Sequence, residues 1–322
     1  MNIMITSAGR RVSLIKAFQK ELKKIAPEGK VFCVDANPKE SAACHVADGC
    51  FEVPRIEHQE YISSLLQCCR SNHVKLIIPT IDTELLILAE HAAFFEEHGV
   101  KVIVTSADFV EKCRNKREIH KFFESIGIAT AKEYTKTAYT LPVFIKPFDG
   151  SRSKDIYLIR KTEDFRSYHF ENDKLMFLEY LDHEQYEEFT CDMYYDRSHH
   201  LRCVVPRKRI EVRDGEVNKG VTERNDLIPF LKEKMRFVPG ALGCFTAQFF
   251  LHKTNGNVYG IEVNPRFGGG YPLSYLAGAN FPKWIIEEHL MDKTIEDQFE
   301  VWEDQLLMLR YDDEILVHGY KG

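Results

Sequence analysis

Three side chains that carry oxygen ligands lie in two apolar segments of the sequence. Glu262 and Asn264 are two positions apart in the apolar run 258–264, so in a β-strand both would lie on the same face. A turn-forming stretch separates this run from an earlier apolar run that contains Gln248. This pattern predicts an antiparallel hairpin with Gln248 close to Glu262. One carboxylate and two amides are suited to a hard cation such as Mg²⁺.

Arg266 follows the second strand of this hairpin and would place a fixed positive charge at its end. A guanidinium in that position suits a phosphate or a carboxylate group. An ordinary hairpin whose polar side chains face solvent is the alternative interpretation, and the pattern alone leaves both open.

The order of these residues, Gln248 and then Glu-Val-Asn-Pro-Arg at 262–266, resembles the metal-binding signature of the ATP-grasp superfamily. The form is that of the carbamoyl phosphate synthetase large subunit and its single-unit relatives, which include ligases of the pyrrolysine pathway. The resemblance implies ATP as cofactor and Mg²⁺, or Mn²⁺ in its place, bound by Gln248, Glu262 and Asn264, with two metal ions expected. It also implies that Arg266 stabilises a phosphorylated intermediate. It extends loosely over nearly the whole chain.

The composition argues against several classes of protein. The 322 residues are enough for two or three lobes, because single cores stop growing near about 250 to 300 residues. A net charge of −6 argues against nucleic acid as a partner. No apolar run approaches the roughly 20 residues of a membrane span, so we expect a cytoplasmic protein without a membrane partner. The nine cysteines show no Cys-x-x-Cys spacing, and we expect reduced thiols without a disulfide framework or zinc site.

Strand and helix patterns alternate through the first hundred or so residues. An apolar strand at 2–7 leads through Gly9, Arg10 and Arg11 into a helix. Strands are then expected at 31–35, 74–79 and 100–105, and helices at 61–70 and 83–98. This alternation predicts a doubly wound, Rossmann-like lobe. Only Gly9 stands where dinucleotide-binding loops have three glycines, so neither a nicotinamide cofactor nor a Rossmann oxidoreductase is expected. The two arginines either hold an anionic substrate group or are surface charges.

The fold class expected for the whole chain is α/β, with α+β character in the lobes that bind the nucleotide. The resemblance implies a Rossmann-like N-terminal lobe followed by a two-lobe ATP-grasp fold. We expect an N-terminal domain at 1–107, a small ATP-grasp lobe with a phosphate-binding lid at 108–180, and a large lobe with the metal site at 181–322.

Lys146 is the one charged residue in the strand pattern at 142–147, and an ammonium there would bridge the α- and β-phosphates of ATP. The segment that follows resembles the glycine-rich phosphate loop of the family, although basic residues replace further glycines. The resemblance implies phosphate contacts from Gly150, Ser151 and Ser153.

Two further segments gain a role from the resemblance. The spacing at 108–127 is helical. The resemblance implies that Lys116 in this segment would contact the phosphates, although a surface lysine is the other explanation. Adenine would be read by main-chain atoms of a hinge formed by Glu179, Tyr180 and Leu181.

The resemblance gives the ribose hydroxyls to Glu188, with Glu187 as the competing choice. The run 207–213 holds four cations in seven residues, which ordinarily indicates solvated charge. Beside a polyphosphate site, strand alternation favours Arg209 and Arg213 as contacts of the γ-phosphate or of an acyl phosphate.

The resemblance implies an ATP- and Mg-dependent carboxylate–amine (or thiol) ligase that acts through an acyl phosphate and releases ADP and phosphate, and these residues fit that activity. Its substrates would be a small-molecule carboxylate and an amine. The sequence shows no recognisable Ser-His-Asp or Cys-His arrangement, and an acyl-phosphate route requires no covalent nucleophile. A catalytically silent ATP-binding regulatory or scaffold protein is the alternative, and a homodimer is compatible with either.

Overall fold

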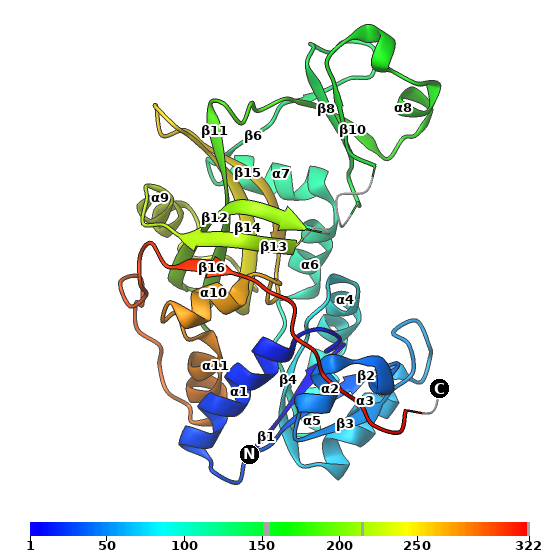
Figure 1. The fold of residues 1–322 in the computed structure, drawn as a ribbon, viewed down its shortest axis with the longest axis vertical. Coiled ribbons are helices and arrows are strands. Elements are labelled where there is room, and N and C mark those ends of the chain that lie inside the picture. Colours follow the sequence, from blue (N-terminus) through cyan, green and yellow to red (C-terminus); the bar gives the residue numbers. More distant parts are fainter. Residues whose placement is uncertain (151–154, 214–215, 321–322) are drawn as a thin grey trace.

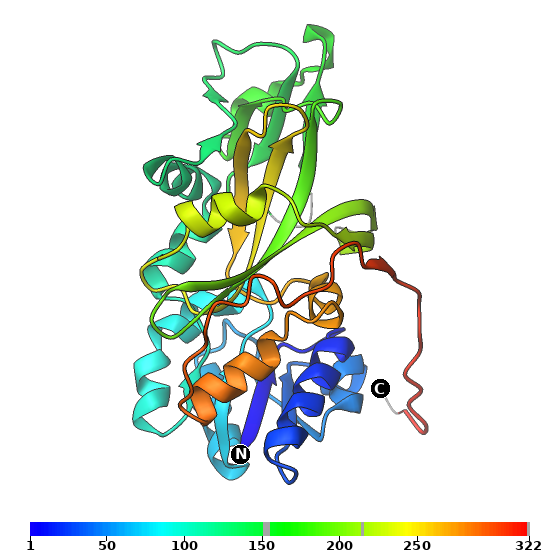
Figure 2. The same ribbon diagram turned by 90° about the vertical axis from the view of Figure 1, so that its left-hand side faces the viewer.

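Three β-sheets follow one another along the chain, each flanked by helices (Figure 1). The computed structural model describes residues 1–150, 155–213 and 216–320. The N-terminal sheet lies at one end of the molecule, the small sheet at the other and the largest sheet between them, as the view turned by 90° also shows (Figure 2).

The N-terminal sheet is parallel and has the strand order β3-β2-β1-β4-β5. Its strands are β1 (Asn2–Thr6), β2 (Val31–Asp35), β3 (Gly49–Glu52), β4 (Val74–Ile78) and β5 (Lys101–Val102). Its helical segments are α1 (Val12–Ile25), η1 (Pro38–Glu40), α2 (Ala42–Val46), α3 (Tyr61–Ser71), α4 (Asp82–Glu90) and α5 (Ala92–Glu97). The order is that of a doubly wound sheet, which confirms the predicted class of this lobe. The single helix expected at 83–98 is two helices that meet at His91.

The small sheet is antiparallel and has the order β7-β10-β8-β9. It consists of β7 (Glu133–Tyr134), β8 (Val143–Pro147), β9 (Tyr157–Ile159) and β10 (Leu175–Glu179), with the short helices η2 (Thr162–Asp164) and α8 (Ser167–Glu171). Its apolar side chains form a cluster of their own, built from Val143, Ile145, Ile159, Leu175 and Phe177. This lobe therefore has an independent core.

The largest sheet has the order β16-β13-β12-β11-β14-β15-β6 and is antiparallel except where β6 joins β15. Its strands are β6 (Ala129–Thr130), β11 (Tyr186–Tyr195), β12 (Leu201–Arg213), β13 (Glu216–Thr222), β14 (Gly243–His252), β15 (Val258–Asn264) and β16 (Leu307–Leu309). Its helices are α6 (Ala107–Arg114), α7 (Lys116–Ser125), α9 (Leu227–Lys234), α10 (Tyr271–Leu276) and α11 (Phe281–Leu290).

The helical segment expected at 108–127 is broken at Asn115, whose side chain accepts a hydrogen bond from the Arg117 N–H at 3.0 Å and caps α7. Helix α7 packs on β15, and a Cβ on Gly260 would come within 2.4 Å of the Phe123 ring. Glycine at this position lets the helix approach the strand closely. Helices α6 and α7 and strand β6 thus lie against the large sheet, although the domain boundaries expected from the sequence group them with the small lobe.

The N-terminal lobe and the large lobe share one hydrophobic core. Phe18 of α1 packs edge-to-face on Phe267, which follows β15, with ring centroids 5.8 Å apart. Helix α1 also lies against α10 and α11. Apolar packing therefore connects the two lobes that meet at the domain boundary expected near residue 107.

The cysteines differ from the expectation of nine reduced thiols. Cys44 of α2 and Cys50 of β3 form a disulfide, with Cα atoms 5.2 Å apart. The short connection from α2 into β3 brings the two residues together, and neither residue spacing nor a sequence motif announces this.

The last described segment, beyond β16, runs alongside the molecule and returns to the N-terminal lobe (Figure 2). There the Tyr320 hydroxyl donates to a Glu40 carboxylate oxygen at 3.0 Å. Among the described residues, no helix combines the length and the apolar composition that crossing a bilayer requires.

Candidate active site

The expected hairpin is formed by β14 and β15. Gln248 lies directly opposite Glu262, and Thr246 lies opposite Asn264. All four side chains therefore share one face of the sheet. The register shifts just after Gln248, and such irregularities often occur beside functional sites because they redirect side chains.

Glu262 lies at the centre of the site. Its Oε1 accepts a hydrogen bond from Asn264 Nδ2 at 3.1 Å, and its Oε2 is 3.6 Å from Lys116 Nζ. Burial raises the pKa of this carboxyl group, but Lys116, Lys146, the hydrogen bond from Asn264 and Arg266 together outweigh that effect, so the pKa lies below its usual value. Glu262 is therefore a carboxylate at neutral pH.

Lys146 comes from the small sheet and is 7% exposed. Burial lowers the pKa of its ammonium to about 8, with Glu262 opposing the shift and Lys116 adding to it. Lys146 thus belongs to one electrostatic cluster with Glu262 and Lys116. The two lysines come from different lobes, and an anion between them would relieve their repulsion.

Lys116, the first residue of α7, is also tied to the loop after β8. Its N–H donates to Phe148 O at 2.8 Å and its Nζ donates to Gly150 O at 2.6 Å. A Cβ on Gly150 would lie 2.5 Å from the Pro147 ring, so this turn requires glycine. The two serines expected to contact phosphate, Ser151 and Ser153, lie outside the described residues.

Arg266 closes the site on the side of the N-terminal lobe. Its Nη2 donates to Asp82 Oδ2 at 2.7 Å, and Asp82 is the first residue of α4. Burial lowers the pKa of this guanidinium, but Asp82 and Glu262, with a smaller effect of Cys244, together raise it above its usual value. Arg266 Nε is buried and has no partner among the described residues, so this donor is available to a ligand.

The predicted ribose and phosphate residues on β11 and β12 meet each other. Glu188 shares the face of Gln248, because Thr190 lies opposite Gln248 and alternate residues share a face. Glu188 forms an ion pair with Arg209. Glu187 points to the other face, where Lys208 contacts it at 2.6 Å.

Arg213 lies away from this cluster. Its side chain is 70% exposed near the end of β12, and its guanidinium is 3.6 Å from a carboxylate oxygen of Asp312. The other predicted cation, Arg209, is 17% exposed and stays with the site. The structure therefore brings one of the two cations to the cluster, and a role for Arg213 stays a prediction.

The predicted hinge connects the small sheet to the largest sheet. The Glu179 N–H donates to Lys132 O at 2.8 Å, Leu181 is buried, and Arg160 lies over the Tyr180 ring at 5.6 Å from its centroid. These residues end β10 and precede β11, so they lie between the two lobes that carry Lys146 and Glu262.

A second buried cluster was not found from the sequence. Arg207 of β12 and Asp192 of β11 form a bidentate ion pair with N–O distances of 2.7 and 3.0 Å. Ser274 Oγ donates to Asp192 at 2.6 Å, and Thr246 Oγ1 contacts both Asp192 and the carbonyl of Arg266. The cluster thus ties the segment after β15 to the sheet. The sequence signal that could have indicated this cluster is one charged residue within each of two apolar strand patterns.

Two glycines that follow Arg266 lie very close to the side chains of this cluster. A Cβ on Gly270 would lie 2.2 Å from Arg207 Nη1, which leaves no room for a side chain. A Cβ on Gly268 would come equally into conflict with Thr246, at 2.8 Å from its hydroxyl. The glycines after Arg266 therefore allow the backbone to pass directly over the buried charges.

His120 of α7 contacts the backbone of strand β15 next to Glu262. Its Nε2 lies 3.2 Å from the carbonyl of Ile261, which only accepts, so Nε2 carries the proton. Burial lowers the pKa of His120 to about 4, with Lys146 acting in the same direction. His120 is therefore neutral at pH 7 and holds the residue before Glu262.

The donor set of the hairpin fits a hard divalent cation. Glu262 is ionised, and Gln248 and Asn264 add amide oxygens on the same face. Asn264 turns its Nδ2 toward Glu262 here, so ligation would require the amide to present its oxygen instead. Lys116 would at the same time exchange its contact with Glu262 for a phosphate.

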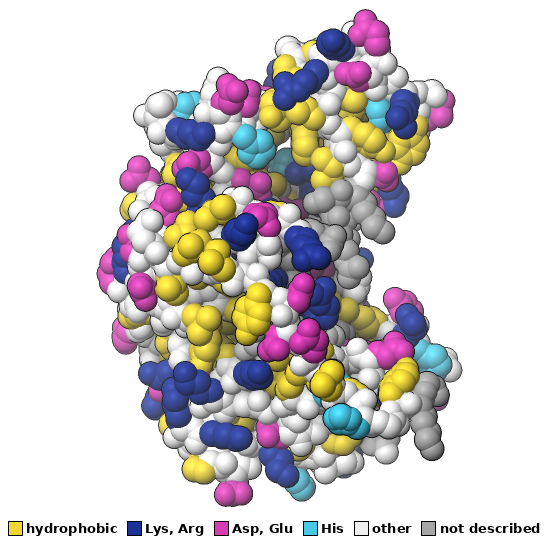
Figure 3. All heavy atoms as spheres, in the orientation of Figure 1, with side chains coloured by type: hydrophobic (Ala, Val, Ile, Leu, Met, Phe, Trp, Pro, Cys, Tyr) yellow, Lys and Arg dark blue, Asp and Glu magenta, His cyan; other side chains and the backbone are white. Residues whose placement is uncertain are grey.

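The surface is notched between the small lobe and the N-terminal lobe on the right of the space-filling view (Figure 3). The candidate residues come from three lobes: Lys146 from the small sheet, Glu262 from the largest sheet, and Asp82 from the N-terminal lobe.

Comparison with known proteins identifies the fold. A family model described as the PylC-like N-terminal domain matches residues 3–103, and one described as ATP-grasp in the biosynthetic pathway with Ter operon matches residues 171–308. Residues 3–103 are therefore similar to a PylC-like N-terminal domain, and residues 171–308 are similar to an ATP-grasp domain. The chain is 24% identical over 299 residues to a carbamoyl-phosphate synthase of Methanobrevibacter smithii, covering 85% of this chain and 77% of the relative.

Two solved structures share this fold. N5-carboxyaminoimidazole synthetase from Staphylococcus aureus in complex with ADP is 16% identical, with a TM-score of 0.71 over 93% of this chain and 79% of that one. The biotin carboxylase domain dimer of Hydrogenobacter thermophilus 2-oxoglutarate carboxylase, in complex with MgADP, ADP and bicarbonate, is 14% identical. Its TM-score is 0.69, over 95% of this chain and 73% of that one. The expected fold class is confirmed.

Proposed function

We propose that the protein is an ATP- and Mg-dependent ligase that joins a carboxylate to an amine, or to a thiol, through an acyl phosphate. The observation that carries this proposal is the convergence of Lys116 and Lys146, from two lobes, on the ionised Glu262. Two ammonium groups and a metal-binding carboxylate together suit a polyphosphate.

ATP would bind between the small and large lobes. Lys146 and Lys116 would hold its phosphates, with Gly150 at the turn beside them. The hinge between β10 and β11 would hold the adenine, and Glu188 would accept hydrogen bonds from the ribose after exchanging its contact with Arg209. The two solved structures that share this fold contain ADP or MgADP, which supports a nucleotide site in this chain.

Gln248, Glu262 and Asn264 would hold Mg²⁺, with two ions expected and Mn²⁺ as a substitute. When bound, the metal neutralises the negative charge that the phosphates share during transfer.

The reaction consists of two displacements. A carboxylate oxygen of the substrate forms a bond to the γ-phosphorus as the bond from that phosphorus to ADP breaks. The amine then forms a bond to the acyl carbon, loses a proton, and phosphate leaves with the carboxylate oxygen. Arg266, with its unpartnered Nε, would contact the carboxylate and the acyl phosphate, and Arg209 would add positive charge on the same face.

The test is product analysis with a labelled substrate. A screen of carboxylates and amines for ADP release would first identify a substrate pair. With an ¹⁸O-labelled carboxylate, label should then appear in inorganic phosphate, and AMP should not form. Label in AMP would refute the acyl-phosphate route, and binding of Mg-ATP without ADP release by any pair would favour a silent nucleotide-binding protein.

A further inference from the structure

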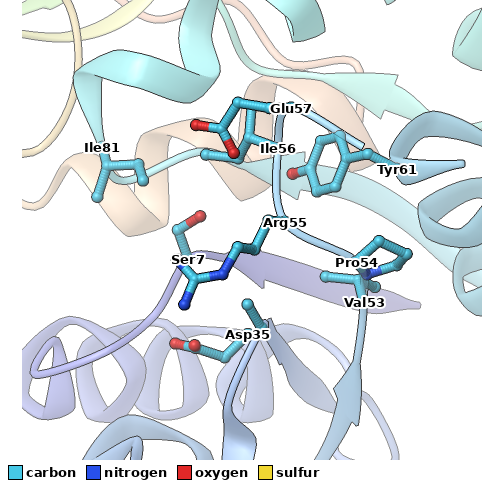
Figure 4. A pocket seen from close by; sticks show the side chains of 10 residues that line it. Ser7, Asp35, Val53, Pro54, Arg55, Ile56, Glu57, Tyr61 and Ile81 are labelled. Atoms are coloured by element: carbon cyan, nitrogen blue, oxygen red, sulfur yellow. The ribbon is translucent and has the colours of Figure 1, made fainter. Parts of the chain in front are cut away.

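A cavity of about 280 Å³ opens at the C-terminal ends of the strands in the N-terminal lobe (Figure 4). Its polar and apolar walls include Ser7, Asp35, Arg55, Glu57, Tyr61 and Ile81. These residues follow strands β1 to β4, where the order of the sheet reverses, because the chain continues from β1 to β2 on one side and later adds β4 on the other. Crevices at such points are the usual ligand sites of open α/β sheets.

The walls are held in place by hydrogen bonds. The carboxylate of Asp35 accepts from the N–H groups of Gly9 and Asn37 at 3.0 and 3.1 Å. The Thr80 hydroxyl lies 2.9 Å from the carbonyl of Ser7, which has a φ of 49°, a conformation rare outside glycine. Backbone conformations of this kind occur preferentially at functional sites.

The cavity contains charges of both signs. Figure 4 shows the Arg55 side chain extending between Glu57 and Asp35. Within the described part of the chain, neither the Arg55 guanidinium nor the Glu57 carboxylate has a hydrogen bond or ion pair. Both side chains are therefore available to a ligand.

A third acidic residue, Glu84, is buried next to the residues that line the cavity. The Tyr61 hydroxyl, at the edge of the cavity, donates to Oε1 of the fully buried Glu84. Burial raises the pKa of Glu84 to about 7, although the bond from Tyr61 opposes the shift. Asp35 and Glu57 are the acidic groups that line the cavity itself, and they favour a ligand with a positive group.

The cavity adjoins the candidate active site. Ile81 lines the cavity, and the next residue, Asp82, holds Arg266. Consecutive Cα atoms are about 3.8 Å apart, so one peptide unit separates the cavity wall from the residue that orients Arg266.

We infer that this cavity is the amine-substrate subsite of the proposed ligase and that it takes a zwitterionic amino acid. Arg55 would bind the carboxylate of the amino acid, and Asp35 and Glu57 would bind its ammonium and accept the proton that it loses before the amine attacks. The volume suits one small molecule and is too small for a dinucleotide, since drug-sized ligands occupy roughly 300 to 1,000 Å³. The inference rests on the proposed function.

The test measures binding by titration calorimetry without ATP, so that it does not depend on turnover. The panel contains amino acids, the matching amines without a carboxylate, the matching N-acetyl amino acids, and nucleosides. At least one amino acid should bind, with both truncated analogues about tenfold weaker or worse, the loss expected for one charge-assisted contact. Arg55→Gln should abolish the preference for the amino acid over its amine.

Asp35→Asn and Glu57→Gln should abolish the preference over the N-acetyl form. Because Asp35 also supports the loop at Gly9, Glu57→Gln is the decisive variant of the two. The matched control is Arg70→Gln, an exposed arginine at the end of α3 in the same lobe. All variants should bind Mg-ATP as the parent does.

The two proposals fail separately. The subsite is overturned if no amino acid binds, if nucleosides bind in its place, or if Arg55→Gln leaves both binding and amine-dependent ADP release unchanged. If amino acids bind and the variants respond as expected, but no substrate pair releases ADP, the subsite stands and the ligase proposal falls.

Discussion

Asp82 of the N-terminal lobe accepts a hydrogen bond from Arg266 of the large lobe, with Oδ2 and Nη2 2.7 Å apart. The carboxylate is 41% exposed and the guanidinium 15% exposed, so the contact lies at the edge of the site. It fixes one nitrogen of Arg266 and leaves Nε without a partner among the described residues. The N-terminal lobe therefore takes part in orienting a residue of the candidate active site.

Asp82→Asn should lower turnover while leaving the affinity for Mg-ATP unchanged. The substitution keeps the size of the side chain but removes the charge that orients Arg266, and a loss of about tenfold in kcat is expected, on the order of 1.4 kcal/mol. The measurements are steady-state ADP release and ATP binding by calorimetry. Asp108→Asn, at an exposed position at the start of α6, is the control. A parallel loss of ATP affinity would show that Asp82 acts on the nucleotide instead.

Lys146→Ala should weaken Mg-ATP binding and leave the fold intact. One charge-assisted contact to phosphate is lost, which costs roughly 1.5 to 3 kcal/mol of binding free energy. Calorimetry measures the affinity, and circular dichroism checks the fold. Lys121→Ala on the exposed face of α7 is the matched control. Parent-like affinity in the Lys146 variant would remove this residue from the site.

The same lysine should make ATP affinity depend on pH. Its pKa of about 8 means that the ammonium is present below pH 7 and is progressively lost above pH 8. The affinity of the free protein for Mg-ATP should therefore fall as pH rises through about 8, and saturating nucleotide should move the transition upward. A flat profile from pH 7 to 9 would contradict the assignment.

Glu262→Gln should separate binding from chemistry. Glu262 is the only acid among the three proposed metal ligands, and the substitution removes its charge but keeps its size. Nucleotide affinity should fall little, since Lys146 and Lys116 remain, whereas turnover should fall by about a hundredfold or more because metal neutralisation matters most in the transition state. Raised Mg²⁺ or Mn²⁺ should restore part of it. Normal binding and turnover in this variant would place the metal elsewhere.

His120→Gln should change how stability depends on pH. The folded-state pKa of about 4 lies below the ordinary value of 6.5, so the folded protein binds fewer protons between these values. Stability from this group is complete above about pH 6.5 and is lost as pH falls toward 4, a change of about 3 kcal/mol. Free energies of unfolding, measured by urea titration at several pH values, should depend less steeply on pH in the variant. His289, also with a lowered pKa, is unchanged and accounts for part of the slope that remains.

Much of the fold follows from local pattern. The strands β1, β2, β4 and β8 and the helix α3 agree with the expected segments to within one or two residues, because each has a clear apolar period. The short helix α2 and the strand β3 carry too few residues for a period to show. The break between α6 and α7 depends on one cap, Asn115, within a continuous helical pattern.

The candidate site likewise contains some residues that the sequence predicts and others that it does not. Gln248, Glu262 and Asn264 belong to adjacent strands, and a hairpin with a short turn determines which of their residues are neighbours. Asp82 and Arg266 are 184 residues apart, and only the packing of two lobes brings them together. The pair of Arg207 and Asp192 required the register of two long strands, which alternation alone does not give.

The shared core described above bears on how the molecule moves. Phe18 and Phe267 belong to one apolar cluster that runs through the N-terminal and large lobes, whereas the small lobe packs only around its own cluster. The three sheets thus belong to two units. The N-terminal and large lobes form one unit, which carries Glu262, Arg266 and Asp82, and the small lobe is the other unit, which carries Lys146. Bending at the connection after Glu179 would change the separation of Lys146 from Glu262 without disturbing the bond between Asp82 and Arg266. We therefore expect that the small lobe can change its grip on the nucleotide while the contact that orients Arg266 stays in place.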